Sequence, residues 1–301
     1  MAIMCIGQSA YDILVPMQDS IVENQKYRIT DKVECGGGPA LNSAYLCSLW
    51  GAEVYLVSRI GKDYYGDQLR KILVDTGVNI DYLIKDDKIS TPYSFILCNQ
   101  QNGNRTLFNF PGEKSGLDFT LPDEKIDVIL SDGHEPEVSI AAIKKYPDAI
   151  SVVDAGTYRE STYQVAKEVD YIVCSEDFAR QYTGKAVNLE NWEECKEIFA
   201  EVKKINNKEA VITLGEKGLL YEMDGELIHL DAYKVKAIDT NGAGDIFHGA
   251  FAYGIDKKLE LLDILKKSSM ASAISVQSMG GQISIPTLAE VEKQLDLVSK
   301  K

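Results

Sequence analysis

The chain has 301 residues, of which 26% are charged and 45% hydrophobic, and its formal net charge is -14 at pH 7. Such a composition is typical of a globular protein, and the length predicts a single domain over residues 1–301. The strong negative charge argues against nucleic acid and against an anionic membrane surface as partners, because both attract basic surfaces.

The six cysteines are scattered, with no C-x-x-C pair and no zinc-type spacing. Reduced thiols in a core are the favoured interpretation. The first residues lack the basic segment of a signal peptide, and no apolar run reaches transmembrane length. We therefore expect a cytoplasmic protein.

Short β-rich runs alternate with longer helical patterns. After a first strand that ends before Gly7, buried strands are expected at 54–57, 126–130, 150–153, 171–173 and 210–214. Helices are expected at 39–50, 64–76, 158–168, 190–205, 244–256, 260–279 and 287–298. This alternation predicts an α/β fold, with a mainly parallel sheet and helices on both faces.

Two segments, roughly 13–34 and 89–113, break this rhythm. Both are strand-like with alternating polar residues, as in Thr91–Leu97 and Arg105–Phe110. We expect a small antiparallel sheet that projects as a lid over a ligand and could pair with a second copy of itself. Plain edge hairpins are the alternative interpretation.

Two early motifs are candidates for binding a polyhydroxylated ligand. Asp12 is expected where the first strand ends, on the ligand side of an open sheet, where a carboxylate can accept hydrogen bonds from two sugar hydroxyls. The stretch Gly36–Gly38 runs into a helix that carries Asn42, and its amides could hold hydroxyls or an anion. A turn-capping aspartate and a flexible glycine turn are the alternatives.

Two later turns suit a nucleotide and a cation. Thr213, Gly215 and Gly218 follow a buried strand, and the glycines would leave room for a nucleotide, although an ordinary turn would look the same. Gly280 and Ser284 follow the last long helix, where turn carbonyls and a hydroxyl suit a monovalent cation. An ordinary helix end is the alternative there.

The most informative stretch is Asp239–Asp245, which runs directly into an apolar helical pattern. A glycine turn that opens a helix presents free N–H groups and the positive end of the helix dipole to an anion. A carboxylate beside bound phosphate repels it, so Asp245 is better explained as a base that accepts a proton from an attacking hydroxyl. The pattern predicts phosphoryl transfer to an alcohol, with a tight turn and a first-turn carboxylate as the alternative.

In this order, the motifs closely resemble the ribokinase or PfkB family of carbohydrate kinases, over nearly the whole chain. Asp239–Asp245 is similar to the family's D-T-x-G-A-G-D signature, and Gly36–Asp63 is similar to its other signature. The resemblance implies a three-layer αβα sandwich with a small β-lid that often forms a dimer contact. It also implies transfer of the ATP γ-phosphate to a sugar hydroxyl.

The resemblance carries roles to individual residues. Asp245 matches the catalytic base, and the other matches are Gly242, Ala243 and Gly244 for the anion hole, Asp12, Gly37, Gly38 and Asn42 for the sugar, Thr213, Gly215, Gly218 and Thr240 for the nucleotide, and Asp239, Asn241, Gly280 and Ser284 for K⁺. Mg²⁺ would accompany ATP. The family's N-x-x-E motif is altered here, and Glu176 is the candidate replacement as a magnesium ligand.

The sequence says less about which substrate accepts the phosphoryl group. Arg105 in the lid and Arg159 after a strand could each reach an acidic group on the substrate or the γ-phosphate, because arginine binds such groups through two parallel hydrogen bonds. Solvated or structural arginines are the alternative, and core packing is the favoured role of His248. We expect a ketohexose or related ketose kinase. The alternatives are a ribose, nucleoside or sugar-phosphate kinase, or a catalytically silent sugar-binding protein.

Overall fold

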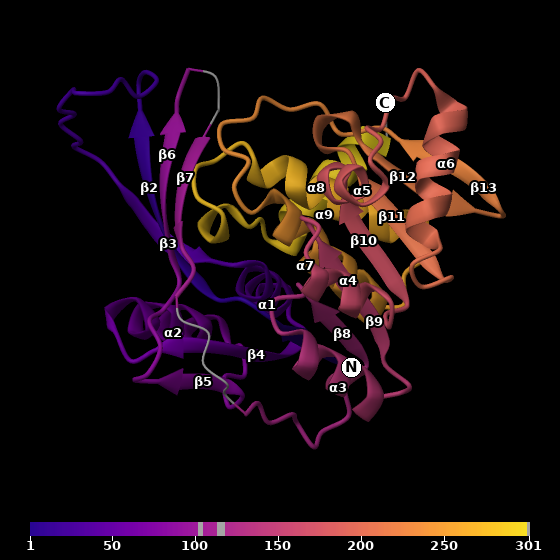
Figure 1. The fold of residues 1–301 in the computed structure, drawn as a ribbon, viewed down its shortest axis with the longest axis horizontal. Helices are drawn as coiled ribbons and strands as arrows, with labels where there is room; N and C mark the ends of the chain where they lie inside the picture. The colour runs from indigo at the N-terminus through magenta and orange to yellow at the C-terminus, as the bar shows by residue number, and fades with distance from the viewer. Residues whose placement is uncertain (102–104, 113–117, 300–301) are drawn as a thin grey trace.

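The computed structural model describes residues 1–101, 105–112 and 118–299. Within them, the larger sheet has the strand order β13-β12-β11-β10-β9-β8-β1-β4-β5 (Figure 1). Its strands are β1 (Ala2–Ile6), β4 (Glu53–Gly61), β5 (Leu83–Asp86), β8 (Val128–Ser131), β9 (Ile150–Ala155), β10 (Tyr171–Ser175), β11 (Glu209–Thr213), β12 (Leu219–Met223) and β13 (Glu226–Leu230). Neighbours from β5 to β11 pair in parallel, and β12 and β13 add an antiparallel hairpin at one edge.

Helices cover both faces of this sheet (Figure 1). One layer packs into a single apolar cluster and holds α1 (Pro39–Leu49), α2 (Tyr64–Thr76), α7 (Ala243–Asp256), α8 (Leu261–Ser275) and α9 (Leu288–Ser299). The other layer holds α3 (Pro136–Lys145), α4 (Glu160–Ala166), α5 (Glu176–Thr183) and α6 (Trp192–Lys203).

The sheet can serve both layers because side chains alternate along each strand. In β1, Ile3 and Cys5 join the first layer's cluster, whereas Met4 and Ile6 join the cluster under α3. The three-layer αβα fold with a mainly parallel sheet is therefore confirmed. All six cysteines are buried and unpaired. Among the described residues, no helix is long and apolar enough to cross a membrane.

A smaller sheet projects beside the larger one, with strand order β3-β2-β6-β7 (Figure 1). Its strands are β2 (Ala10–Met17), β3 (Val33–Gly37), β6 (Tyr93–Asn99) and β7 (Arg105–Phe110). The expectation of a purely antiparallel lid is wrong, because the central pair β2 and β6 is parallel. The chain re-enters the main sheet between these two strands, so a crossover and not a hairpin joins them. Residues 102–104 and 113 of the expected lid lie outside the described residues.

Side chains of the main domain fix the start of the second lid segment. Asp63 caps α2 by accepting from Gly66 N at 2.8 Å, and its carboxylate also accepts from Thr91 N at 2.8 Å and Thr91 Oγ1 at 2.7 Å. Gly61 N donates to the same threonine hydroxyl at 2.9 Å. The stretch that ends the glycine-loop signature therefore holds the lid against the sheet.

Candidate active site

The Asp239–Asp245 stretch forms the turn that opens α7. Gly242 caps the helix with φ 74°, in the left-handed region that glycine tolerates best, and a Cβ there would lie 3.0 Å from Gly281 Cα. Ile246 N donates to Gly242 O at 2.9 Å, which is the first bond of the regular helical pattern. The N–H groups of Gly244 and Asp245 precede that bond, so they can bind an anion, as predicted for helix N-termini.

Gly244 differs from Gly242 because no protein contact requires a glycine there. The residue is exposed, and a Cβ placed on it would meet no heavy atom within 4 Å. Its open side borders a large cavity described below. The glycine therefore leaves space beside the turn that a side chain would otherwise fill, which is what an approaching phosphate group requires.

Asp245 lies in the first turn of α7 and is held by α1. Asn42 Nδ2 donates to Asp245 Oδ2 at 2.6 Å, and Ser43 Oγ donates to the Asp245 carbonyl at 3.0 Å. Burial and the nearby charge of Asp154 raise the pKa of Asp245 well above that of an ordinary aspartate, while the Asn42 hydrogen bond opposes the rise. A carboxylate with a raised pKa can accept a proton near neutral pH.

Asp12 does not end the first strand, as expected from the sequence. β1 stops at Ile6, and Asp12 is the third residue of the lid strand β2, because the chain begins a new sheet at Ala10. Its buried carboxylate accepts from Asn241 Nδ2 at 2.9 Å, so it lies beside the anion-hole turn after all. Burial raises the pKa of Asp12 to about 6, although the Asn241 hydrogen bond lowers it.

The glycines before α1 make room for Asp12 and for the chain around it. A Cβ on Gly37 would lie 2.5 Å from Asp12 Oδ2, and a Cβ on Gly38, which has φ 90°, would lie 2.6 Å from Gln8 O. Asn42, in the first turns of α1, is buried, and its Oδ1 has no hydrogen-bond partner among the described residues. These residues thus gather around Asp245 and offer an unsatisfied acceptor atom.

A cavity of about 650 Å³ lies on the other side of the α7 turn. It is lined by all four residues expected at a nucleotide site, namely Thr213, Gly215, Gly218 and Thr240, and by Ala243 and Gly244 of the turn. Lys217, Tyr233, Lys234 and Phe247 also line it and were not expected. Lys217 lies inside the glycine turn and could have been found there, whereas Tyr233 and Lys234 follow β13 and carry no motif.

Glu176 is the first residue of α5 and forms an ion pair with Lys217. Its carboxylate oxygens lie 2.8 and 2.7 Å from Lys217 Nζ. The pair lies at the rim of the cavity, since Lys217 is one of its lining residues. No group of three or more His, Cys, Asp or Glu side chains that could hold a metal ion occurs within the part of the chain that the structure describes.

The four residues expected at a potassium site lie on two segments that hydrogen bonds connect, one before α7 and one after α8. Asp239 is buried, and its carboxylate accepts from Asn241 N and from Gly280 N, both at 2.9 Å. Ser284 N donates to Gly280 O at 3.1 Å, and Ser284 Oγ donates to Gly281 O at 3.0 Å. The oxygens are hard ligands of the kind that suit K⁺, although several already accept a hydrogen bond.

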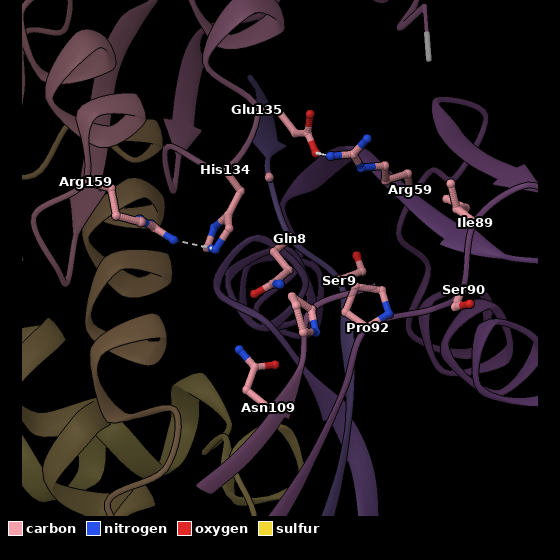
Figure 2. A pocket seen from close by; sticks show the side chains of 12 residues that line it. Gln8, Ser9, Arg59, Ile89, Ser90, Pro92, Asn109, His134, Glu135 and Arg159 are labelled. Atoms are coloured by element: carbon pink, nitrogen blue, oxygen red, sulfur yellow. Dashed lines mark hydrogen bonds and ion pairs between the residues drawn. The ribbon is translucent and has the colours of Figure 1, made fainter. Parts of the chain in front are cut away.

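A second cavity, of about 270 Å³, lies between the lid and the main sheet (Figure 2). Figure 2 shows Arg159 pointing toward His134 on one side of it, and Arg59 paired with Glu135 at 2.6 Å on another. Arg159 donates to His134 Nε2 at 2.6 Å, to Asp132 O at 3.1 Å and to Thr162 Oγ1 at 3.2 Å.

Arg159 therefore has no carboxylate ion pair among the described residues. Arg105 does not line this second cavity. It donates from β7 to Asn241 Oδ1 at 3.3 Å, across from the anion-hole turn. The two arginines expected near an acidic group consequently lie at different places in the site.

The sequence of the whole chain was compared with models of protein families. The model of the pfkB family of carbohydrate kinases matches residues 2–288. The chain belongs to this family. The chain is thus a phosphotransferase that acts on an alcohol group.

Individual relatives of this pfkB family kinase agree with that assignment. It is 28% identical over 272 residues to a ribokinase of Staphylococcus aureus, covering 86% of this chain and 87% of that protein. It is 25% identical over 316 residues to a deoxyribokinase of Salmonella typhi, covering 99% of both.

Solved structures resemble the kinase over almost its full length. Ribokinase from Thermotoga maritima has a TM-score of 0.82 and 25% identity, covering 98% of this chain and 99% of that one. Ribokinase from Arabidopsis thaliana in complex with ribose and ATP has a TM-score of 0.81 and 22% identity, covering 98% of both chains. The predicted family is therefore confirmed, whereas its ketohexokinase-like or sulfofructose-kinase-like branch stays a prediction.

Proposed function

We propose that this protein is an ATP-dependent sugar kinase that transfers the γ-phosphate of ATP to a hydroxyl of a ketohexose or related ketose. The observation that carries the proposal is the position of two adjacent residues. Gly244 borders the large cavity, and Asp245 contacts Asn42 on the opposite side of the same turn. A phosphate donor and a hydroxyl acceptor bound on these two sides would meet at the start of α7.

The chemistry needs one proton acceptor and one site for negative charge. The acceptor hydroxyl gives its proton to the Asp245 carboxylate, its oxygen bonds to the γ-phosphorus, and the bond from that phosphorus to the bridging oxygen of ADP breaks. The turn Gly242–Ala243–Gly244, through the N–H groups of Gly244 and Asp245 that precede the first helical bond, and the dipole of α7 stabilise the charge that develops on the transferring group.

The acceptor would lie between α1 and the lid. Asp12 and the unpaired Oδ1 of Asn42 offer acceptor atoms for hydroxyl groups. Gly37 and Gly38 carry no side chain that would displace Asp12 or Gln8. Arg159, without a carboxylate partner among the described residues, lines the second cavity beside His134 (Figure 2). An acidic group on the distal end of the substrate would complement this guanidinium, whereas Arg105 is better placed near the phosphoryl group.

Thr213, Gly215, Gly218 and Thr240 would hold the nucleotide, with Lys217 and Lys234 near its phosphates. Mg²⁺ bound with ATP would neutralise phosphate charge, and Glu176 could ligate it only by sharing its carboxylate with Lys217. K⁺ bound by Asp239, Asn241, Gly280 and Ser284 would fix the turn before α7. Replacing K⁺ with Na⁺ should lower kcat, and equal rates in both salts would remove the potassium proposal.

We also infer a cytoplasmic homodimer formed through the lid. Three large apolar side chains of β7 are at least 45% exposed, namely Leu107, Phe108 and Phe110. Burial of such side chains against a second lid would remove them from water. Sedimentation of the wild type and Phe108→Glu tests this inference, because a dimer held by the lid should become monomeric in the variant. An unchanged mass for the variant would place the contact elsewhere.

An acceptor panel tests the proposed function. ADP release is measured with ATP, Mg²⁺ and K⁺ and with ketoses, aldoses, sugar phosphates, sugar acids and nucleosides. Turnover concentrated on ketoses supports the proposal. The names of the relatives favour ribose, deoxyribose or a nucleoside as the second candidate, so turnover on these alone would replace the ketose. No turnover on any acceptor, with ATP still bound, would indicate a silent sugar-binding protein.

A further inference from the structure

His248 is a buried polar residue that the reaction described above does not use. It lies on α7, one turn after Asp245, and is 3% exposed. Its Nδ1 is 2.6 Å from Gly244 O and 3.2 Å from Asp154 Oδ2, and its Nε2 is 3.0 Å from Val173 O. Sequence reasoning favoured core packing for this residue, but both of its ring nitrogens face oxygen atoms.

These contacts restrict the protonation of the ring. A neutral imidazole has one N–H donor and one acceptor nitrogen. Here a carbonyl oxygen lies against each nitrogen, so either neutral tautomer would direct a lone pair at a carbonyl oxygen. A ring with a proton on both nitrogens satisfies Gly244, Asp154 and Val173 together. Asp154, which is also buried, then serves as the counterion of the imidazolium.

We propose that His248 is a positioning residue for phosphoryl transfer, an inference that rests on the proposed kinase function. As an imidazolium, it ties the Gly244 carbonyl to Asp154 on β9 and to Val173 on β10. It thereby fixes the turn whose N–H groups face the phosphate. It also places a buried positive charge beside Asp154, the carboxylate whose charge acts on Asp245.

The charge matters because carboxylates crowd this end of the sheet. Asp154, Asp12 and Asp132 all disfavour ionisation of Asp245, and His248 offsets the charge of Asp154. Within the described residues, the charged or titratable groups that act on Asp154 or Asp245 include Asp132, Asp12, His134 and Arg159. The packed helices α1 and α8 contribute the uncharged Asn42 and Ser272. Removing only the positive member leaves Asp154 to repel the ionised base.

Two substitutions with opposite predicted effects test the electrostatic part. His248→Asn removes the positive charge that offsets Asp154, so the repulsion between Asp154 and the ionised base should increase and move the acid limb of kcat/KM upward by roughly one pH unit. Asp154→Asn should move the same limb downward by a similar amount. The double variant should return close to the wild-type position. His229→Asn, on the edge strand β13, is the comparison variant. Its ring contacts Lys217 O at 2.6 Å, so the substitution can change the KM for ATP, but it should leave the pH of the acid limb unchanged.

A readout without activity tests the protonation itself. The ¹⁵N shifts of the His248 ring in the intact protein should show both nitrogens protonated at neutral pH, whether or not the protein is a kinase. Neutral-ring shifts would overturn the proposal. The proposal would also be overturned if kcat and the melting temperature of the variants fell together while the acid limb of kcat/KM stayed at the wild-type pH. That result would show that His248 acts only through packing. If His248→Asn does not fold, His248→Gln supplies the same comparison. Absence of transfer in the wild type, with an imidazolium ring, would instead refute the proposed function.

Discussion

Asn42 of α1 donates its side-chain amide to the carboxylate of Asp245 on α7, with 2.6 Å between Nδ2 and Oδ2. The two residues are 203 positions apart in the chain. This contact joins the helix after the glycine loop to the helix after the anion-hole turn. The two signatures found in the sequence therefore meet at the proposed base, where Asn42 binds the carboxylate and Ser43 binds the backbone carbonyl.

Asn42→Ala should lower kcat/KM by roughly 10²-fold, because a small misplacement of a catalytic group has effects of that order. Steady-state kinetics with the preferred acceptor measure the loss. Ser43→Ala is the neighbouring control, since Ser43 binds only the backbone carbonyl of Asp245. A loss in Ser43→Ala as large as that in Asn42→Ala would show that packing of α1, and not the amide, is responsible.

Gly244→Ala should separate activity from stability. A Cβ at Gly244 meets no protein atom within 4 Å, and alanine favours a helix over glycine by roughly 0.5–1 kcal/mol, so the variant should unfold no more easily than the wild type. Its kcat/KM should nevertheless fall, because the methyl group occupies the space proposed for the phosphate.

Gly249→Ala is the matched control on the same helix. A Cβ there would lie 3.0 Å from Ser43 Cα, so overpacking should cost roughly 1–3 kcal/mol of stability. Denaturant unfolding and kinetics of both variants make the comparison. Normal kcat/KM in Gly244→Ala would contradict the anion hole.

The raised pKa of Asp245 predicts a pH effect on stability as well as on rate. Because the carboxyl group is more easily protonated in the folded state than in the unfolded state, ionised Asp245 destabilises the fold. The cost is absent below the unfolded pKa of about 3.9 and grows as the pH rises through the folded pKa. Asp245→Asn should therefore raise the melting temperature more at pH 9 than at pH 4. An equal change at both values would show that the pKa of Asp245 is not raised.

The main fold followed from periodicity, because strands such as Ile150–Ala155 are mostly apolar and buried and alternate with helices. The helices α3 and α5 were missed, although the shorter α4 was predicted, and α5 begins with the acidic pair Glu176–Asp177 and not with an apolar pattern. The parallel pairing of β2 with β6 was also missed. Register between strands some eighty residues apart depends on tertiary packing, which local patterns do not contain.

Some residues of the site could likewise be predicted from local sequence, whereas others could not. The turn residues around Asp245 were predictable because a helix start and its glycines are local features. Asp12 was expected near the ligand for the wrong reason, since it reaches the site from a lid strand and not from the end of β1. The partners of His248 could not be predicted, because Asp154 and Val173 lie on two strands far from α7 in sequence.

Turnover by Asp245→Asn tests the central claim most directly. With the preferred acceptor, kcat should fall by roughly 10²–10⁴-fold, as expected when a general base is removed, while the dissociation constant for ATP stays near the wild-type value. Asn42 can still donate to the new amide oxygen, so the variant should keep the geometry of the turn. A variant that transfers the γ-phosphate at a rate close to the wild type would contradict the assignment of Asp245 as the catalytic base.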